Sequence, residues 1–155
     1  MKYYIIAGEA SGDLHGSNLM KGIYAEDPQA EIRFWGGDCM NSVWESHMKN
    51  TPHLPAGESG LVRHYKEGAV MGFVEVIAKA GRLLKNVDFC KKDILQWNPD
   101  VVILIDYPGF NFKIAEFAHK AGFKVFYYIA PKVWASREGR IRKIRKYVDK
   151  LFIVF

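Results

Sequence analysis

The sequence predicts an α/β protein with a doubly wound parallel sheet. Apolar, β-rich runs alternate with segments of helical periodicity along the whole chain. The run at 101–105 is apolar throughout, which is typical of a strand buried on both faces in the middle of a parallel sheet. A glycine-rich loop follows the first apolar run, where such sheets bind ligands. With 155 residues, 49% of them hydrophobic, we expect one domain over 1–155 that fills its own core.

The first part of the chain supplies two predicted strands and two predicted helices. The apolar run at 2–7 breaks into Gly8-Glu9-Ala10-Ser11-Gly12-Asp13, which predicts a strand and then a loop. Ser11 and Asp13 are favourable N-cap residues, so a helix is expected from them to about residue 25. A second strand is expected at 31–35, before two glycines, and a short helix at about 38–45.

Residues 46–66 carry little periodic signal. Pro52, Pro55, Gly57 and Gly60 lie among polar residues, and only 61–62 suggest a short strand. We therefore expect a long exposed loop at 46–66, inserted into the fold.

The remaining segments continue the alternation. Apolar residues recur at steps of three and four from Val70 to Ile94, which predicts a helix over about 70–97. Its first turns are apolar on more than one face, and core packing alone does not require this. After the strand at 101–105 we expect a helix at about 110–121, a strand at 124–129, a basic helix at about 139–147 and a strand at 151–155. Because the sequence stops inside that apolar run, we expect it to be the N-terminal part of a longer chain; a complete domain that ends in a strand is the alternative.

The positive charge is concentrated near the end of the sequence. The whole chain carries a net charge of +5, but residues 132–150 contain eight basic and two acidic side chains. This stripe includes Arg137 and Arg140. It indicates either a phosphate-bearing or membrane partner, or only a solvated helix face.

Several classes of protein are not indicated. The two cysteines and five histidines show no metal-ligand spacing. The apolar run at the N-terminus is too short for a signal peptide, and no stretch has the length of a membrane span. We expect a cytoplasmic protein without a metal site.

Carboxylates follow two of the predicted strands. Glu9 and Asp13 lie in the glycine loop, which matches neither GxGxxG nor a P-loop and suits sugar hydroxyls better than a pyrophosphate. The simpler interpretation is that Asp13 caps a helix and Glu9 is solvated. Asp106 directly follows the apolar strand, where a carboxylate can act as a base or can simply bind loop amides. Asn111 is placed to begin or cap the next helix.

Four motifs in this order resemble one family. They are Gly8-Glu9-Ala10-Ser11-Gly12-Asp13, residues 70–76 (VMGFVEV), residues 106–111 (DYPGFN) and residues 128–135 (YIAPKVWA) followed by Arg137. Together they closely resemble the N-terminal half of the lipid-A-disaccharide synthase family. The sequence departs from the family pattern at Ala130 and Ser136, which affects local contacts rather than the carboxylates.

The resemblance implies a Rossmann-like, acceptor-side domain of a two-domain GT-B glycosyltransferase that inverts the anomeric centre and uses no cofactor. The family transfers 2,3-diacylglucosamine from UDP-2,3-diacylglucosamine to lipid X, which is 2,3-diacylglucosamine 1-phosphate. By resemblance, Asp106 is the general base. Glu9, Ser11 and Asn111, which lie on adjacent strand-end loops, are expected to orient the acceptor sugar by hydrogen bonds. We expect this sequence alone to be inactive, because the C-terminal donor domain is missing.

The resemblance also implies a lipid partner. An enzyme of this family would dock on the inner face of the bacterial inner membrane, with Val70, Met71, Phe73, Val74 and Ile77 as an amphipathic anchor. Packing of these residues against the missing domain is the alternative. Arg137 and Arg140 would then contact the acceptor phosphate, the UDP of the donor or anionic headgroups.

Two further functions are open to test. A non-catalytic membrane-surface or anion-binding domain would use the same basic stripe. A nucleic-acid-binding module is disfavoured, because the sequence has no known binding motif and no aromatic residues interleaved with the stripe on a sheet platform.

Overall fold

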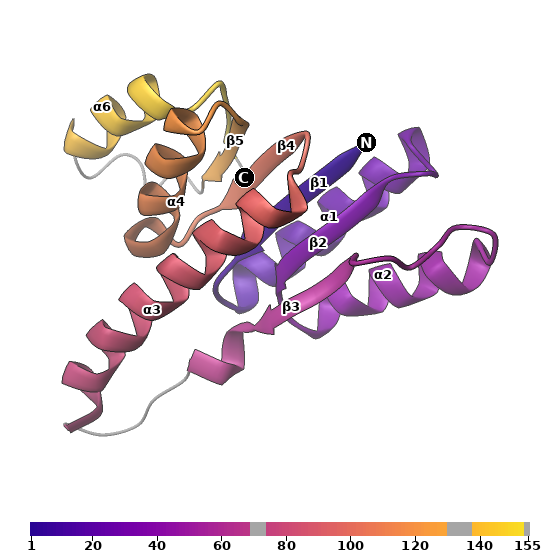
Figure 1. Ribbon diagram of the computed structural model, residues 1–155, viewed down its shortest axis with the longest axis horizontal. Helices are drawn as coiled ribbons and strands as arrows, with labels where there is room; N and C mark the ends of the chain where they lie inside the picture. The colour runs from indigo at the N-terminus through magenta and orange to yellow at the C-terminus, as the bar shows by residue number, and fades with distance from the viewer. Residues whose placement is uncertain (69–73, 130–137, 154–155) are drawn as a thin grey trace.

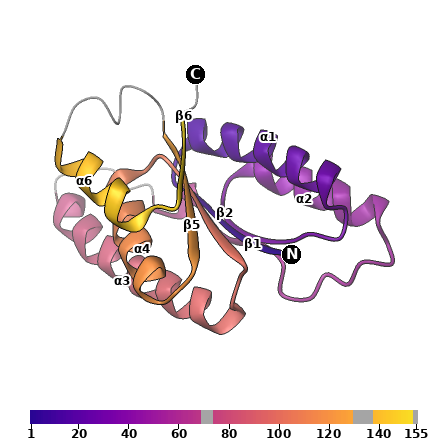
Figure 2. The ribbon, with the colours of Figure 1, turned by 90° about the horizontal axis from the view of Figure 1, so that it is seen from above.

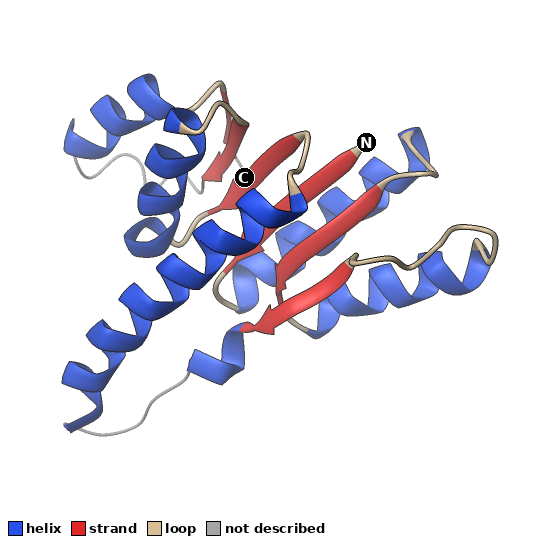
Figure 3. Cartoon of the chain, in the orientation of Figure 1, coloured by secondary structure: helices blue, strands red, loops and turns tan. Residues whose placement is uncertain are grey.

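The computed structural model describes residues 1–68, 74–129 and 138–153, and its strands form one parallel sheet. The strands are β1 (Lys2–Ala7), β2 (Glu31–Gly36), β3 (Gly60–His64), β4 (Val101–Ile105), β5 (Lys124–Ile129) and β6 (Lys150–Ile153). Their order in space is β3-β2-β1-β4-β5-β6, and every neighbouring pair is parallel (Figure 3). The chain moves outward from β1 to one edge and then returns to the centre at β4. This confirms the predicted doubly wound sheet.

The helices cover both faces of the sheet. Helices α1 (Ala10–Glu26) and α2 (Asp38–Asn50) lie on one face, and α3 (Val74–Trp97), α4 (Pro108–Lys120) and α6 (Glu138–Tyr147) lie on the other (Figure 2). A short 3-10 helix, η1 (Tyr65–Gly68), follows β3. Because each helix connects two parallel strands, the N-terminal ends of the helices lie at the carboxyl edge of the sheet.

Each face of the sheet has its own hydrophobic core. Side chains of β1 alternate between the two cores: Tyr4 and Ile6 face α3 and α4, whereas Ile5 and Ala7 face α1 and α2. All five residues of β4 are buried, as the unbroken apolar run predicts. The two central strands therefore hold the loops that follow them in fixed positions at the carboxyl edge.

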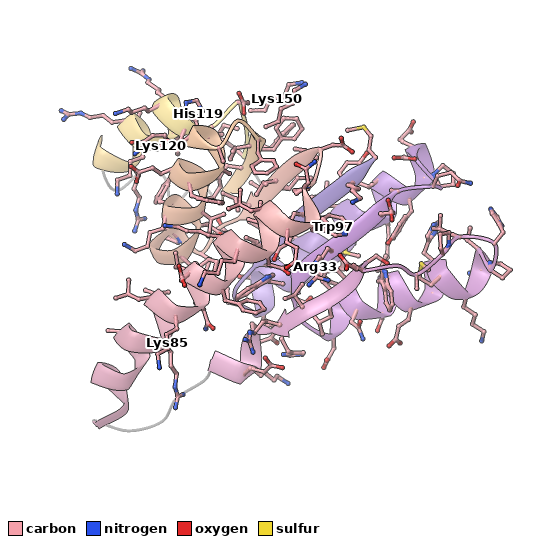
Figure 4. The ribbon with its side chains drawn as sticks, viewed as in Figure 1. Arg33, Lys85, Trp97, His119, Lys120 and Lys150 are labelled. Carbon is pink, nitrogen blue, oxygen red and sulfur yellow. The ribbon has the colours of Figure 1, made fainter. Side chains whose placement is uncertain are left out.

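Helix α3 is tied to the sheet by a polar network. Arg33 on β2 donates two hydrogen bonds to Asp93, from Nε and Nη2, each 2.7 Å long. The Tyr4 hydroxyl donates to the same carboxylate at 2.7 Å and accepts from Trp35 Nε1 at 2.8 Å. Figure 4 shows Arg33 on the sheet face covered by α3.

The predicted loop at 46–66 is wrong for much of its length. Helix α2 continues to Asn50 instead of ending near residue 45, and 60–64 form β3, an edge strand paired with β2. The additional helical turn is held by contacts distant in sequence, since the His47 ring stacks on Tyr24 with ring centroids 3.7 Å apart. Only residues 51–59 lack a helix or strand.

The other boundaries agree with the sequence to within a few residues, with one correction of the helix caps. Helix α1 begins at Ala10 with Glu9 at the N-cap position, so neither Ser11 nor Asp13 caps it. Residues 69–73, with which the 70–97 helix was expected to begin, and the last two residues of the expected final strand lie outside the described residues.

Helix α3 extends beyond the sheet. Its N-terminal turns project past the carboxyl edge, beyond the end of β3 (Figure 1). Its exposed residues there include Arg82, Leu84 and Lys85. Leu84 is 60% exposed although it continues the apolar pattern. This part of α3 is available to contact something other than the sheet.

Candidate functional site

The turn after β4 has an unusual backbone. Asp106 and Tyr107 have φ values of 43° and 51°, in the left-handed region that residues other than glycine rarely adopt. Two consecutive residues of this kind are unfavourable unless their surroundings hold them. The Asp106 amide donates to the Tyr128 carbonyl at 2.8 Å. The Asp106 carbonyl accepts from the Tyr127 hydroxyl at 2.7 Å and from Asn111 Nδ2 at 2.9 Å.

Asn111 lies at the start of α4, as expected, and its side chain is buried. It is fully buried in the first turn of α4, and its Nδ2 also lies 3.3 Å from the Ile105 carbonyl and 3.4 Å from that of Ile6. The amide therefore ties together the ends of β1 and β4. Asn111 is buried, and the contacts of its Nδ2 are with backbone carbonyls around the Asp106 turn. Direct binding of an acceptor sugar by Asn111 stays a prediction.

Asp106 lies where its charge is weakly screened. The residue is 5% exposed. Burial raises the pKa of the neighbouring Tyr127 hydroxyl well above its usual value, the Asp106 charge raises it further, and the Arg140 charge lowers it. Asp106 and Arg140, which the sequence singled out separately, thus act on the same hydroxyl from β4 and α6.

The loop after β1 meets the Asp106 turn. A Cβ on Gly8 would overlap the Tyr107 ring, with its nearest atom at 2.2 Å, so only glycine allows this approach. Burial raises the pKa of Tyr107, and the Glu9 charge raises it further. Glu9 and Ser11 are both exposed beside this contact. β1 and β4 are neighbours at the point where the strand order reverses, which is the usual ligand-binding position of a doubly wound sheet.

Asp13 caps α2, and its carboxylate does not take part in the glycine loop after β1. Its carboxylate accepts hydrogen bonds from the backbone amides of Gly37 at 2.8 Å, Cys39 at 3.0 Å and Met40 at 3.0 Å. A Cβ on Gly37 would come within 2.8 Å of Asp13 Oδ2. Asp13 is 3% exposed, so it is not available to a sugar.

Two hollows lie on either side of the Asp106–Tyr107–Pro108 turn. The first, of about 400 Å³, lies between the β1 and β2 ends, η1 and α3 and includes Tyr107 in its wall. We call it the α3 hollow. The second, of about 380 Å³, lies between α4 and α6 and includes Pro108. We call it the α4–α6 hollow; its basic residues are Lys113, Arg140 and Lys143.

The remaining predicted contacts are only partly described. Val70, Met71, Phe73 and Arg137 lie outside the described residues, and for Val74 and Ile77 the structure gives the backbone of α3 alone. Among the described residues, no group of three or more His, Cys, Asp or Glu side chains is arranged to hold a metal ion. The same part of the chain contains no helix long and apolar enough to cross a membrane.

Comparison with known proteins identifies the family. A family model described as "Lipid-A-disaccharide synthetase" matches residues 3–155. The chain belongs to this family. Relatives named lipid-A-disaccharide synthase include those of Geobacter metallireducens, 44% identical over 151 residues, and Trichlorobacter lovleyi, 39% identical over 150 residues. Each match covers 97% of this chain and 36% of the relative, so the chain spans about a third of the length of these synthases.

A solved structure supports the fold independently. The UDP-GlcNAc 2-epimerase from Methanocaldococcus jannaschii matches 100% of this chain and 40% of its own, with a TM-score of 0.53 and 17% identity. This likeness concerns the Rossmann-like α/β fold alone.

Three residues of the site were not singled out from the sequence. Tyr127 donates to the Asp106 carbonyl, Tyr107 lies against Gly8, and Arg63 lines the α3 hollow. Tyr107 lies inside the family motif at 106–111, so the motif could have indicated it as a site residue. Tyr127 looked like an ordinary residue of the expected strand at 124–129, and Arg63 lay in the expected loop at 46–66. Only the pairing of the strands brings them to the site.

Proposed function

We propose that this chain is the acceptor-side part of a lipid-A-disaccharide synthase. The full enzyme joins 2,3-diacylglucosamine, from its UDP derivative, to 2,3-diacylglucosamine 1-phosphate and releases UDP. Membership of the family supports the reaction. The observation that carries the assignment of the base is the Asp106 turn, where a carboxylate on a strained and rigidly held backbone lies at the strand-order reversal.

The proposed chemistry is a single displacement. Asp106 takes the proton from the 6-hydroxyl of the acceptor as that oxygen bonds to the anomeric carbon of the donor. The bond from this carbon to the UDP oxygen breaks on the opposite face, and UDP leaves with the bonding electrons. Glu9 and Ser11, exposed at the end of β1, accept or donate hydrogen bonds to the acceptor sugar.

The remaining proposals concern anions and the membrane. Arg140 lines the α4–α6 hollow with two lysines, which suits a phosphate-bearing ligand. Val74 and Ile77 lie on the part of α3 that projects beyond the sheet, which supports contact of this end with the inner face of the bacterial inner membrane. We expect the chain by itself to be inactive, since the proposed donor site lies elsewhere in the synthase.

The proposed base is tested in a chimera in which this chain replaces the matching third of the G. metallireducens synthase. Asp106→Asn should lower turnover at least about a hundredfold, the usual contribution of a general base. Asp88→Asn, an exposed carboxylate on α3, is the matched control and should leave turnover unchanged. Near-normal turnover of Asp106→Asn would show that another group accepts the proton.

A further inference from the structure

The α3 hollow combines a cationic rim with an aromatic wall. The rim carries three basic side chains, Arg63, Arg82 and Lys85, against the single carboxylate of Glu67. Lys85 extends from α3 on the side that faces η1 (Figure 4). None of these three basic residues belongs to the basic stripe at 132–150. The hollow is therefore a second candidate site for an anionic ligand, separate from the stripe.

The Arg63 side chain is placed to bind an anion. Its Nε is buried and has no hydrogen-bond partner among the described residues, so hydrogen bonds within the protein compensate the guanidinium only in part. The side chain is 41% exposed and lines the hollow, where an anion can reach it. Its nearest acidic neighbour, Glu67, lies 3.8 Å from Nη1 on the exposed side, and such a pair contributes little. The guanidinium sits 4.7 Å from the centre of the Phe89 ring, which holds it in place at the rim.

The wall below the rim is aromatic and continuous. The Trp35 ring centre lies 6.1 Å from that of Phe89 and 5.3 Å from that of Phe110, and Tyr107 stacks on Phe110 at 5.5 Å. Phe89 is 41% exposed, unusual for a phenylalanine beside a hydrophobic core. The α4–α6 hollow differs, since Phe112 is its one aromatic lining residue within the described chain.

We propose that the α3 hollow binds the phosphate of the acceptor together with the adjoining part of an acyl chain. A cationic rim over an aromatic wall matches a phosphate monoester attached to an apolar group, and neither inorganic phosphate nor a neutral lipid satisfies both parts. Tyr107 forms part of the wall and directly follows Asp106, so a ligand held here lies beside the proposed base. The inference rests on the proposed function for the identity of the ligand, while the binding chemistry itself does not require it.

Binding is measured by calorimetry with the 155-residue chain and dodecyl phosphate below its micelle concentration. Inorganic phosphate and dodecyl maltoside are the comparison ligands. Dodecyl phosphate should bind at least about tenfold more tightly than either, because only it satisfies both the rim and the wall. Equal affinity for dodecyl phosphate and dodecyl maltoside would overturn the proposal, since the cations would then contribute nothing.

Variants on one helix locate the site. Lys85→Gln, Arg82→Gln and Phe89→Ala should each weaken dodecyl phosphate binding about threefold to tenfold, as expected for a lost charge or apolar contact. Lys92→Gln and Leu95→Ala, exposed on the same helix outside the hollow, should not. Equal losses in both groups, or a loss with Lys143→Gln instead, would overturn the proposal.

A vesicle-binding experiment distinguishes binding of the acceptor from binding of a membrane lipid. Vesicles of equimolar phosphatidylglycerol and phosphatidylcholine should bind the Lys85→Gln and wild-type chains alike. If Lys85→Gln lost vesicle binding and kept its affinity for dodecyl phosphate, the rim would serve headgroups and the proposal would fail. Since no arm measures sugar transfer, a failure here is distinct from normal turnover of Asp106→Asn in the chimera.

Discussion

Asp13 shows how one side chain can join two helices. Its carboxylate lies in the first turn of α1 but binds three amides at the start of α2. These amides have no partners within their own helix, and the helix dipole there favours a negative charge. The glycine at 37 is needed because any side chain would displace the carboxylate.

We therefore expect Asp13→Asn to lower the free energy of unfolding by about 1–2 kcal/mol, the usual contribution of an N-cap. The amide retains one acceptor oxygen and loses the charge. Urea denaturation measures the change, with Asp88→Asn, whose carboxylate is exposed, as the control. Equal stability of Asp13→Asn and wild type would mean that the three hydrogen bonds add nothing to folding.

Tyr127 and Asn111 act on the backbone of the proposed base. Both donate to the Asp106 carbonyl, which fixes a turn whose φ values are otherwise unfavourable. Tyr127→Phe removes one donor and keeps the ring in the core. In the chimeric synthase we expect kcat to fall about tenfold with little change in KM, because a displaced base affects the reaction more than binding. Tyr128→Phe, on the same strand, is the control. An unchanged kcat would show that the Tyr127 hydrogen bond is not needed to hold the turn.

At the scale of an element, an ion pair links α3 to the sheet in addition to its core contacts. Asp93 accepts two hydrogen bonds from Arg33 and one from Tyr4. Burial alone would raise the pKa of Asp93, but these hydrogen bonds and the Arg33 charge outweigh it, so the pKa lies below its ordinary 3.8. A lowered folded-state pKa stabilises the protein at pH values above the ordinary pKa, and this contribution is lost as the pH falls through the folded-state value.

Asp93→Asn should consequently lower the free energy of unfolding by about 2–4 kcal/mol at neutral pH, because Arg33 loses its partner in a largely buried place. The difference from wild type should shrink below about pH 4 as the wild-type carboxylate is protonated. Urea titrations of both proteins between neutral and acid pH measure it. A difference that stays constant with pH would mean that the charge of Asp93 is not what stabilises α3.

The elements also show what periodicity can and cannot predict. The alternation of strands and helices is local, since each apolar run faces the core through its own spacing, and it predicted the doubly wound sheet correctly. The last turn of α2 and the edge strand β3 depend on partners distant in sequence, such as Tyr24 beneath His47, and so were expected as loop. Asp106 could be singled out because it follows a buried strand. Asp13 was the weaker candidate, because a helix cap was its simpler interpretation, and the position of α2 shows which helix its carboxylate caps.

At the scale of the whole molecule, the proposed functions meet at one edge. The Asp106 turn and both hollows lie at the carboxyl edge of the sheet. The described helices begin at this edge, and the first turns of α3 project beyond it (Figure 1). Substrates that are membrane lipids would reach such a site most directly if this edge faced the bilayer. The opposite edge, where α3 ends near Trp97, would then face away from it.

This orientation predicts which end of α3 binds vesicles. The chain should float with equimolar phosphatidylglycerol and phosphatidylcholine vesicles at low salt, and part of the binding should persist at about 0.5 M salt, where the Debye length falls below about 5 Å. Val74→Ser with Ile77→Ser should reduce the salt-resistant part, because less apolar surface enters the interface. Leu95→Ser, at the other end of the helix and 53% exposed, should have no effect. Flotation lost equally with Leu95→Ser would contradict the orientation, and absence of flotation at either salt would count against both the basic stripe and α3 as membrane contacts.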